Sequence, residues 1–196
     1  MSRPRCARCQ RPLVHCLCSS IPTLTSATQV LILQHPSETS HALNTARLVA
    51  LGLSSAQLRV GEIFELPDDG HDNFLLFPGD TATPIESLAG TARPLRLIVP
   101  DGTWRKARKL LHLDPDLAAL PRVSLPSGLI SRYRLRKAPA PGALSTLEAV
   151  VVALNLLEGE GRFDALLRPF EALIEGQIAA MGTETFERNH LDVSPR

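Results

Sequence analysis

Leu95-Arg-Leu-Ile-Val-Pro-Asp-Gly-Thr-Trp104 is the stretch that decides the fold. Its apolar half predicts a buried strand, and Pro100-Asp101-Gly102 predicts the turn that follows it. Thr103 is placed to cap a helix that begins with Trp104. Because ligands of open α/β sheets bind beyond the carboxyl ends of the strands, Asp101 is a candidate functional carboxylate. The alternative is an ordinary Asp-Gly turn beside a tryptophan that anchors the core.

The composition is that of a soluble globular protein. The chain has 196 residues, of which 44% are hydrophobic, and a net charge of +1. This length suits one domain, alone or with a small appendage. No apolar run approaches the roughly 20 residues of a membrane span, and the N-terminus lacks the apolar segment of a signal peptide. The sequence therefore predicts a cytoplasmic protein without a membrane partner.

Basic residues are concentrated in one part of the chain. All the lysines and many arginines lie between positions 105 and 137, where the only acids are Asp114 and Asp116. Clustered cationic side chains are typical of a surface that binds a phosphate backbone. The alternative is a solvated surface whose acidic partners lie elsewhere in the sequence. The candidate phosphate-binding residues are Arg105, Lys106, Arg108, Lys109, Arg132, Arg134, Arg136 and Lys137.

All the cysteines lie close to the N-terminus, as a CxxC pair followed by a CxC pair. In a cytosolic protein this spacing indicates a metal site rather than disulfides. Four thiolates complete a tetrahedral zinc site, which can fold a segment too short to bury a core of its own. We therefore predict a structural zinc knuckle over residues 1–22, with free reduced thiols as the alternative. The predicted ligands are Cys6, Cys9, Cys16 and Cys18, and they are surrounded by Arg3, Arg5, Arg8 and Arg11.

Apolar runs alternate with predicted helices along the rest of the chain. Several of these runs are apolar on both faces, which is typical of parallel strands covered by helices on both sides. The capping box Ser145-Thr-Leu-Glu148 marks the start of one long helix. The fold class is therefore α/β. The predicted strands are residues 29–34, 57–62, 73–77, 95–99 and 123–125, and the predicted helices are 37–51, 146–158 and 163–181.

Polar side chains gather in the loops that follow the predicted strands. In a parallel sheet, loops 34–38, 77–80, 100–104 and 131–146 share one edge and form a pocket there. No glycine-rich dinucleotide motif, P-loop or serine elbow follows any strand. The residues alone therefore indicate an α/β protein with a polar pocket beside a basic flank. Five pocket residues have roles that the sequence leaves undecided, namely His35, Glu38, His41, Asn44 and Arg47.

Five motifs in a fixed order resemble the DTW-domain tRNA-uridine aminocarboxypropyltransferases, relatives of the SPOUT superfamily of RNA-modifying enzymes. The resemblance runs over nearly the whole chain and indicates a catalytic domain over residues 23–188 with a tail over 189–196. The motifs are the paired cysteines, Gln34-His-Pro-x-Glu38-x-x-His41-x-x-Asn44-Thr45-x-Arg47-Leu48, Leu76-Phe77-Pro78, Asp101-Gly-Thr-Trp104 and Ser145-Thr-x-Glu-Ala149.

This resemblance implies that the 3-amino-3-carboxypropyl group of S-adenosylmethionine is moved to N3 of a tRNA uridine, with release of methylthioadenosine. It also implies a SPOUT-like sheet with a C-terminal trefoil knot. Asp101 is then the group that accepts the N3 proton or orients the uridine, and the basic stretch holds tRNA. By the same resemblance, S-adenosylmethionine contacts Leu76, Phe77, Pro78, Gly102, Thr103, Trp104, Ser131, Leu144, Ser145 and Thr146.

Two other functions remain open from the sequence. The knuckle and the basic stretch also suit an RNA-binding zinc protein without catalysis. A SPOUT-type RNA methyltransferase would keep the same donor and release S-adenosylhomocysteine instead.

Overall fold

A computed structural model describes residues 4–133, 135 and 142–186. A six-stranded sheet lies at the centre of the described chain, in the order β2-β1-β5-β3-β6-β4, and every pairing in it is parallel. The parallel sheet that the sequence predicts is therefore confirmed. The strands are β1 (Gln29–Gln34), β2 (Ala56–Val60), β3 (Asp72–Leu76), β4 (Thr83–Pro84), β5 (Leu95–Asp101) and β6 (Arg122–Ser124).

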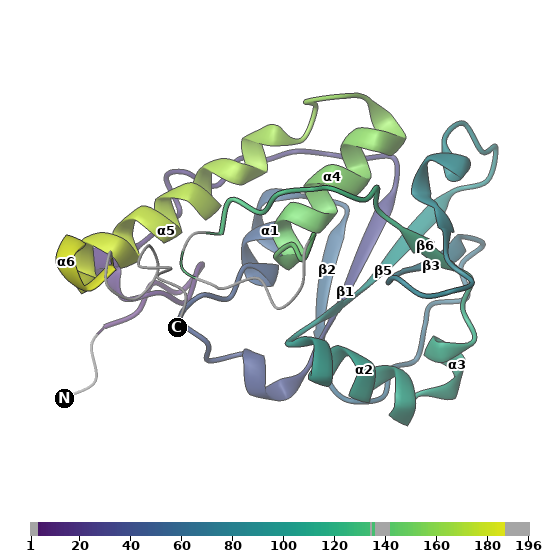
Figure 1. The fold of residues 1–196 in the computed structure, drawn as a ribbon, viewed down its shortest axis with the longest axis horizontal. Helices are drawn as coiled ribbons and strands as arrows, with labels where there is room; N and C mark the ends of the chain where they lie inside the picture. Colours follow the sequence, from purple (N-terminus) through teal and green to yellow (C-terminus); the bar gives the residue numbers. More distant parts are fainter. Residues whose placement is uncertain (1–3, 134, 136–141, 187–196) are drawn as a thin grey trace, which may run out of the picture.

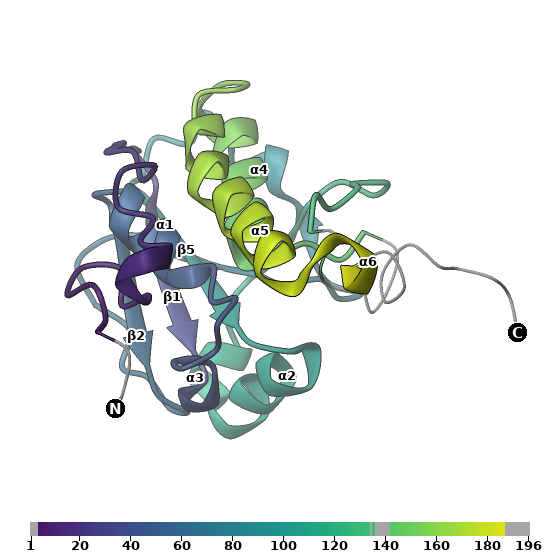
Figure 2. The same cartoon turned by 90° about the vertical axis from the view of Figure 1, so that its left-hand side faces the viewer.

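Helices cover both faces of the sheet, as Figure 1 shows. On one face, α1 (Ala46–Gly52), α4 (Thr146–Glu158) and α5 (Leu167–Met181) form a layer, and α6 (Thr183–Phe186) extends it. On the other face lie α2 (Trp104–Leu113) and α3 (Pro115–Ala118). Figure 2 shows α4 and α5 side by side. Short 3-10 turns occupy Leu13–His15, Pro36–Glu38, Ile85–Leu88 and Asp164–Leu166.

The alternation of side chains along each strand builds two separate cores. Val30 and Ile32 on β1 face the α1/α4/α5 layer, whereas Leu31 and Leu33 face α2 and α3. Since successive side chains of a strand point to opposite faces, an uninterrupted apolar run is needed to fill both cores. All four residues are almost fully buried. The same run that predicted a parallel strand therefore also predicts the three-layer architecture.

The connections that follow the neighbouring strands β1 and β5 run to opposite faces of the sheet. The helix after β1 packs on one face of the sheet, and the helix after β5 packs on the other. Residues Gln34 and Asp101, which end these two neighbouring strands, lie opposite each other in the register. A crevice beyond the carboxyl ends of strands at such a switch point is where open α/β sheets bind ligands.

The segment before α1 differs from the prediction. A helix was expected from Ser37, but after the 3-10 turn at Pro36–Glu38 the α-helix begins only at Ala46. Polar side chains bind the backbone between these points and so compete with helical hydrogen bonds. The Nδ1 of His41 accepts from the N–H of Leu43, and Asn44 donates to the carbonyl of Glu38.

The other elements follow the sequence closely. The long helix 146–158 and its capping box are confirmed at their predicted positions. The final predicted helix is divided into a 3-10 turn and α5, so that Pro169 lies in the first turn of α5, where its missing N–H costs no hydrogen bond. In the part of the chain that the structure describes, no helix has the length and apolar character needed to cross a membrane.

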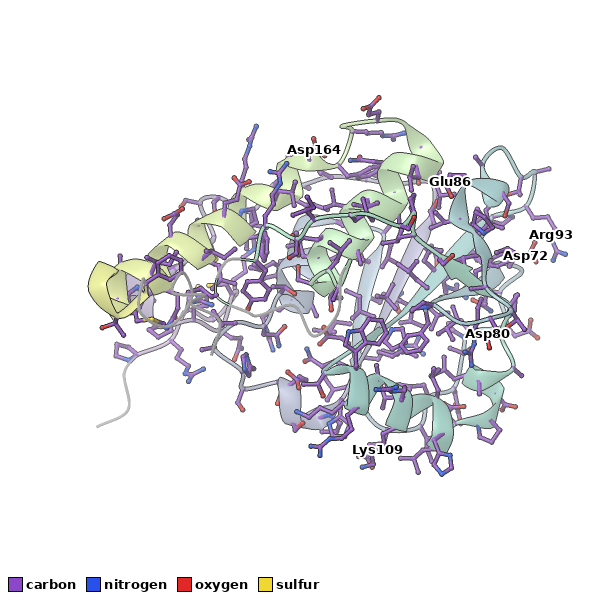
Figure 3. All side chains as sticks on the ribbon, viewed as in Figure 1. Asp72, Asp80, Glu86, Arg93, Lys109 and Asp164 are labelled. Carbon is purple, nitrogen blue, oxygen red and sulfur yellow. The ribbon has the colours of Figure 1, made fainter. Side chains whose placement is uncertain are left out.

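The amino edge of the sheet is held by a buried arginine. Arg96 is 2% exposed and donates to Gln29, Asn73 and the carbonyl of Pro67. It also forms an ion pair with Asp69. A second pair, Asp72 with Arg93 at 3.3 Å, lies at the same edge, on the right in Figure 3. This edge is structural and lies at the opposite end of the sheet from Asp101.

The Asp69–Arg96 pair predicts a specific acid sensitivity. The hydrogen bond from Arg96 lowers the pKa of Asp69 from 3.8 to about 2. Because the pKa is lower in the folded state, the pair stabilises the fold above pH 4, and this stability is lost as the pH falls from about 4 to 2. We expect the unfolding free energy of Asp69→Asn to fall less steeply than that of wild type in this window, measured by urea denaturation. Asp68→Asn, an exposed neighbour outside the pair, is the control, and equal slopes for all three proteins would contradict the prediction.

Candidate functional site

Asp101 is held between two neighbouring segments at the carboxyl edge of the sheet. The Nε2 of Gln34, at the end of β1, donates to Oδ2 of Asp101 at 2.7 Å. The hydroxyl of Thr146, at the start of α4, donates to Oδ1. Asp101 is itself buried. Donors on both carboxylate oxygens fix the plane of the carboxylate and favour its ionised form.

Gln34 has an unusual environment. Its side chain is fully buried, and among the residues that the structure describes its Oε1 has no hydrogen-bond partner. A buried carbonyl oxygen without a partner is unfavourable by about 1–3 kcal/mol. Such a group at the end of a central strand, beside a buried carboxylate, is a functional signal. The sequence names Gln34 only as the first residue of a family motif and assigns it no role.

The loop after β5 depends on a glycine. Gly102 has φ of +153°, and a Cβ at this position would lie 3.1 Å from the Cβ of Lys106. Any other residue would be strained here and crowded against the first turn of α2. Thr103 caps that helix, as predicted, by accepting a hydrogen bond from the N–H of Lys106. The ring of Trp104 then lies 5.3 Å from the ring of Phe77, which follows β3.

Glu148 joins two loops of the predicted site. Its carboxylate, 5% exposed, accepts from the hydroxyl of Ser131 at 2.9 Å and from the N–H of Arg132 at 2.6 Å. It also accepts from both the N–H and the hydroxyl of Ser145, each at 2.8 Å. Glu148, predicted as part of a capping box and of a family motif, therefore also holds segment 131–133 against the start of α4. Leu144 lies next to this contact and is half-buried.

The strand-end loops thus converge as predicted. Phe77 contacts Trp104, Thr146 contacts Asp101, and Ser131 and Ser145 share one carboxylate. Leu76 lies in the core beneath them, and Pro78 is exposed beside Phe77. These contacts bring together segments from four parts of the chain, but the contacts of each residue with a ligand remain predictions.

Two polar residues after β1 are linked to the lysines of α2, one directly and one through Glu62. Glu38 binds the Nζ of Lys106 at 2.6 Å, and His35 binds Glu62 at 3.0 Å through Nε2. Lys109 shares that carboxylate, with its Nζ at 2.6 Å, and its hydrogen bond lowers the pKa of Glu62. Two of the predicted phosphate-binding lysines therefore already have carboxylate partners.

The remaining basic residues differ in whether their side chains form ion pairs. Arg132 forms an exposed pair with Glu171 at 2.8 Å. Arg105 and Arg108 are exposed on α2, and Arg47 is half-buried near the start of α1. For these three side chains, the described part of the chain provides no ion pair or hydrogen bond. Three of the predicted phosphate-binding residues lie outside the described residues, namely Arg134, Arg136 and Lys137.

The four cysteines converge as the spacing predicted. Their sulfur atoms all lie within 4.8 Å of one another, with Cys6 and Cys18 at 3.6 Å and Cys9 and Cys16 at 3.8 Å. A zinc ion with four Zn–S bonds of about 2.3 Å requires S···S separations of about 3.8 Å. The cluster therefore fits a tetrahedral metal. Among the described residues it is the one group of histidines, cysteines and acids arranged to hold a metal.

Backbone geometry supports this site. Gln10 adopts φ of +63° directly after the first pair, and its N–H returns to the carbonyl of Cys6. Backbone N–H groups of Cys9 and Arg8 point at the sulfur of Cys6 and lower the pKa of its thiol, whereas desolvation and the neighbouring thiols raise the pKa of Cys18. Because thiolate is the form that binds metal, binding at this cluster is expected to release protons.

The knuckle packs against the sheet domain. Leu17 and Ile21 belong to the same core as α1 and α4. Arg11 donates to the carbonyl of Ala42 at 2.7 Å, and Arg8 donates to that of Leu51 at 3.4 Å. Arg8 and Arg11, two of the arginines that surround the predicted zinc site, therefore attach the knuckle to the region of α1. Arg3 lies outside the described residues.

Comparisons with known proteins agree with the motifs. The family model described as the DTW domain matches residues 3–178. The chain is 33% identical over 190 residues to tRNA-uridine aminocarboxypropyltransferase 2 of Drosophila melanogaster, covering 90% of this chain and 76% of the relative. It is 36% identical to the Mus musculus protein of the same name, covering 90% of this chain and 64% of the relative. A tRNA-uridine aminocarboxypropyltransferase A of Arabidopsis thaliana is 28% identical, with 81% and 74% covered. No solved structure matches significantly.

Proposed function

Because the chain belongs to the DTW-domain family, we propose that it is a tRNA-uridine aminocarboxypropyltransferase that uses S-adenosylmethionine as the donor and N3 of uridine as the acceptor. The observation that carries this proposal is the buried Asp101 carboxylate, oriented from two sides at the switch point of the sheet. Relatives named for this activity supply the reaction class.

The proposed reaction needs one proton acceptor. The uridine N3 forms a bond to the carbon next to the sulfonium, and the electrons of the broken C–S bond remain on sulfur as neutral methylthioadenosine. The N3 proton passes to Asp101, so one positive and one negative charge are both neutralised. The sulfonium is already a good leaving group, and the enzyme mainly aligns the two reactants and removes the proton.

The donor is proposed to lie along the loops that converge near Asp101. Phe77 and Trp104 supply an aromatic surface, and Gly102 permits close approach of the backbone. Ser131 and Ser145 are both held by hydrogen bonds to Glu148. The acceptor tRNA is proposed to contact the exposed α2 arginines, Arg105 and Arg108. Glu38 and His35 are linked to α2 through Lys106 and through Glu62 with Lys109, and His41, Asn44 and Arg47 are proposed to contribute to the same pocket.

The remaining parts of the proposal are structural. Zinc held by the four cysteines stabilises a knuckle over residues 1–22, and residues 23–188 form the catalytic domain. By family resemblance, that domain carries a SPOUT-type trefoil knot near its C-terminus. The tail over 189–196 lies outside the described residues. We propose that the protein works in the cytoplasm, where its tRNA substrate is found.

A product assay tests the activity. The protein is incubated with S-adenosylmethionine and unmodified tRNA, and nucleosides and small molecules are then identified by mass spectrometry. We expect aminocarboxypropyl-uridine and methylthioadenosine in equal amounts. S-adenosylhomocysteine with a methylated base would instead identify a methyltransferase. Salt-sensitive tRNA binding without turnover would leave a non-catalytic RNA-binding protein.

A further inference from the structure

We infer that Gln34 is a positioning residue for proton transfer, which holds Asp101 in both its ionised and its protonated state. This inference rests on the proposed function. Gln34 contacts the carboxylate of Asp101 from β1, the strand next to β5. Gln34 is fully buried and ends β1, directly opposite Asp101 in the register.

The first part of the argument is the contact itself. Nε2 of Gln34 donates to Oδ2 of Asp101 at 2.7 Å, which stabilises the ionised carboxylate before the reaction. Thr146 fixes the other oxygen. The residue at position 34 is itself held rigidly, because the carbonyl of Gln34 accepts from the N–H of Gly61 on the neighbouring segment. The N–H group that binds Asp101 therefore lies on a central strand and not on a loop.

The second part of the argument concerns Oε1, the other polar atom of the Gln34 amide. After the N3 proton moves to Asp101, the Asp101 side chain carries an O–H group. This O–H needs a hydrogen-bond acceptor, whereas the ionised carboxylate needed a donor. Rotation of the Gln34 amide by half a turn brings Oε1 to the position that Nε2 held. The oxygen that has no partner among the described residues then accepts the new O–H. A leucine or methionine at this position offers neither interaction.

The third part is that folding alone does not explain a buried glutamine here. An unpartnered buried oxygen destabilises the folded state, and an apolar side chain at the end of a buried strand carries no such cost. Gln29 at the other end of the same strand shows the contrast, since its Oε1 accepts twice from Arg96. A buried polar side chain that destabilises the fold in this way is expected at a functional site.

The test compares Gln34→Leu and Gln34→Met with wild type in the product assay. Methionine is included because it is unbranched and adapts to the space that glutamine fills. Both variants remove the unpartnered oxygen but also remove the N–H donor to Oδ2 of Asp101, so we expect a fall in Tm no larger than that of Gln29→Leu. We expect kcat to fall at least tenfold, with KM for S-adenosylmethionine and for tRNA unchanged. Gln29→Leu is the matched control, which is expected to lower Tm because Arg96 loses its acceptor while kcat stays at the wild-type value.

The outcomes separate the inference from the proposed function. Wild-type kcat in both Gln34 variants would overturn the inference and leave the transferase activity standing. If the loss of activity is fully explained by a smaller folded fraction and a lower Tm, the inference is also overturned. Gln34 would then only stabilise the fold. If wild type itself forms no aminocarboxypropyl-uridine, the proposed function fails and the inference fails with it.

Discussion

Asp101→Asn is expected to lower kcat by about 10²- to 10⁴-fold, the contribution of a positioned proton acceptor. Asparagine keeps an oxygen that can orient the uridine N3–H by a hydrogen bond, but it cannot take the proton. The fold should survive this substitution. Oδ1 of the asparagine still accepts from Thr146, and a rotated Gln34 amide accepts from its new N–H group.

Comparison with Asp101→Ala distinguishes a base from an orienting group. Alanine removes both functions, so if Asp101 acts as a base the two variants will be almost equally slow. If Asp101 only orients the uridine, Asp101→Asn will retain much more activity than Asp101→Ala. Single-turnover rates measured at saturating donor and tRNA report the transfer step directly, and Tm values for both variants control for folding. A kcat for Asp101→Asn within threefold of wild type would contradict a role in proton transfer.

The sequence predicts those features of the site that depend on strand ends. A parallel sheet brings the residues after its strands to one edge, so the proximity of the 77, 101 and 146 regions follows from topology. The strand residue Gln34 is less predictable. The sequence gives Gln34 only as the last position of a buried run and the first residue of a family motif. Its contact with Asp101 depends on which strand lies next to β1, and local patterns do not determine this.

Long-range ion pairs are also beyond a reading of local sequence. Lys106 and Lys109 appear as members of a uniform basic stretch, yet their carboxylate partners lie 68 and 47 residues away. Figure 3 shows Lys109 on the outer side of α2. Arg105 and Arg108 on the same helix have no such partners within the described residues. Net charge within one segment therefore overestimates how many of its cations remain available to a phosphate backbone.

Loss of the metal is expected to destabilise the whole protein and not only its N-terminal segment. The cysteine cluster fits a tetrahedral zinc. Leu17, between Cys16 and Cys18, and Ile21, shortly after them, both belong to the main core. Release of these two side chains removes roughly 3–6 kcal/mol of burial. For a chain of this size, that corresponds to a fall in Tm of roughly 6–24 °C. Arg8 and Arg11, which bind carbonyls near α1, would lose their positions as well.

Cys16→Ser is the sharpest test, because Cys16 is exposed and its replacement leaves the core packing intact. Its neighbour His15 is exposed too and lies outside the cluster, so His15→Ala is the matched control. Metal analysis is expected to find about one zinc per chain in wild type and His15→Ala, and much less in Cys16→Ser. Calorimetry should then show the lower Tm in Cys16→Ser alone, and a chelator should reproduce it in wild type. Zinc-free protein with the wild-type Tm would refute a structural metal, because a closed four-thiolate site contributes its binding energy to folding.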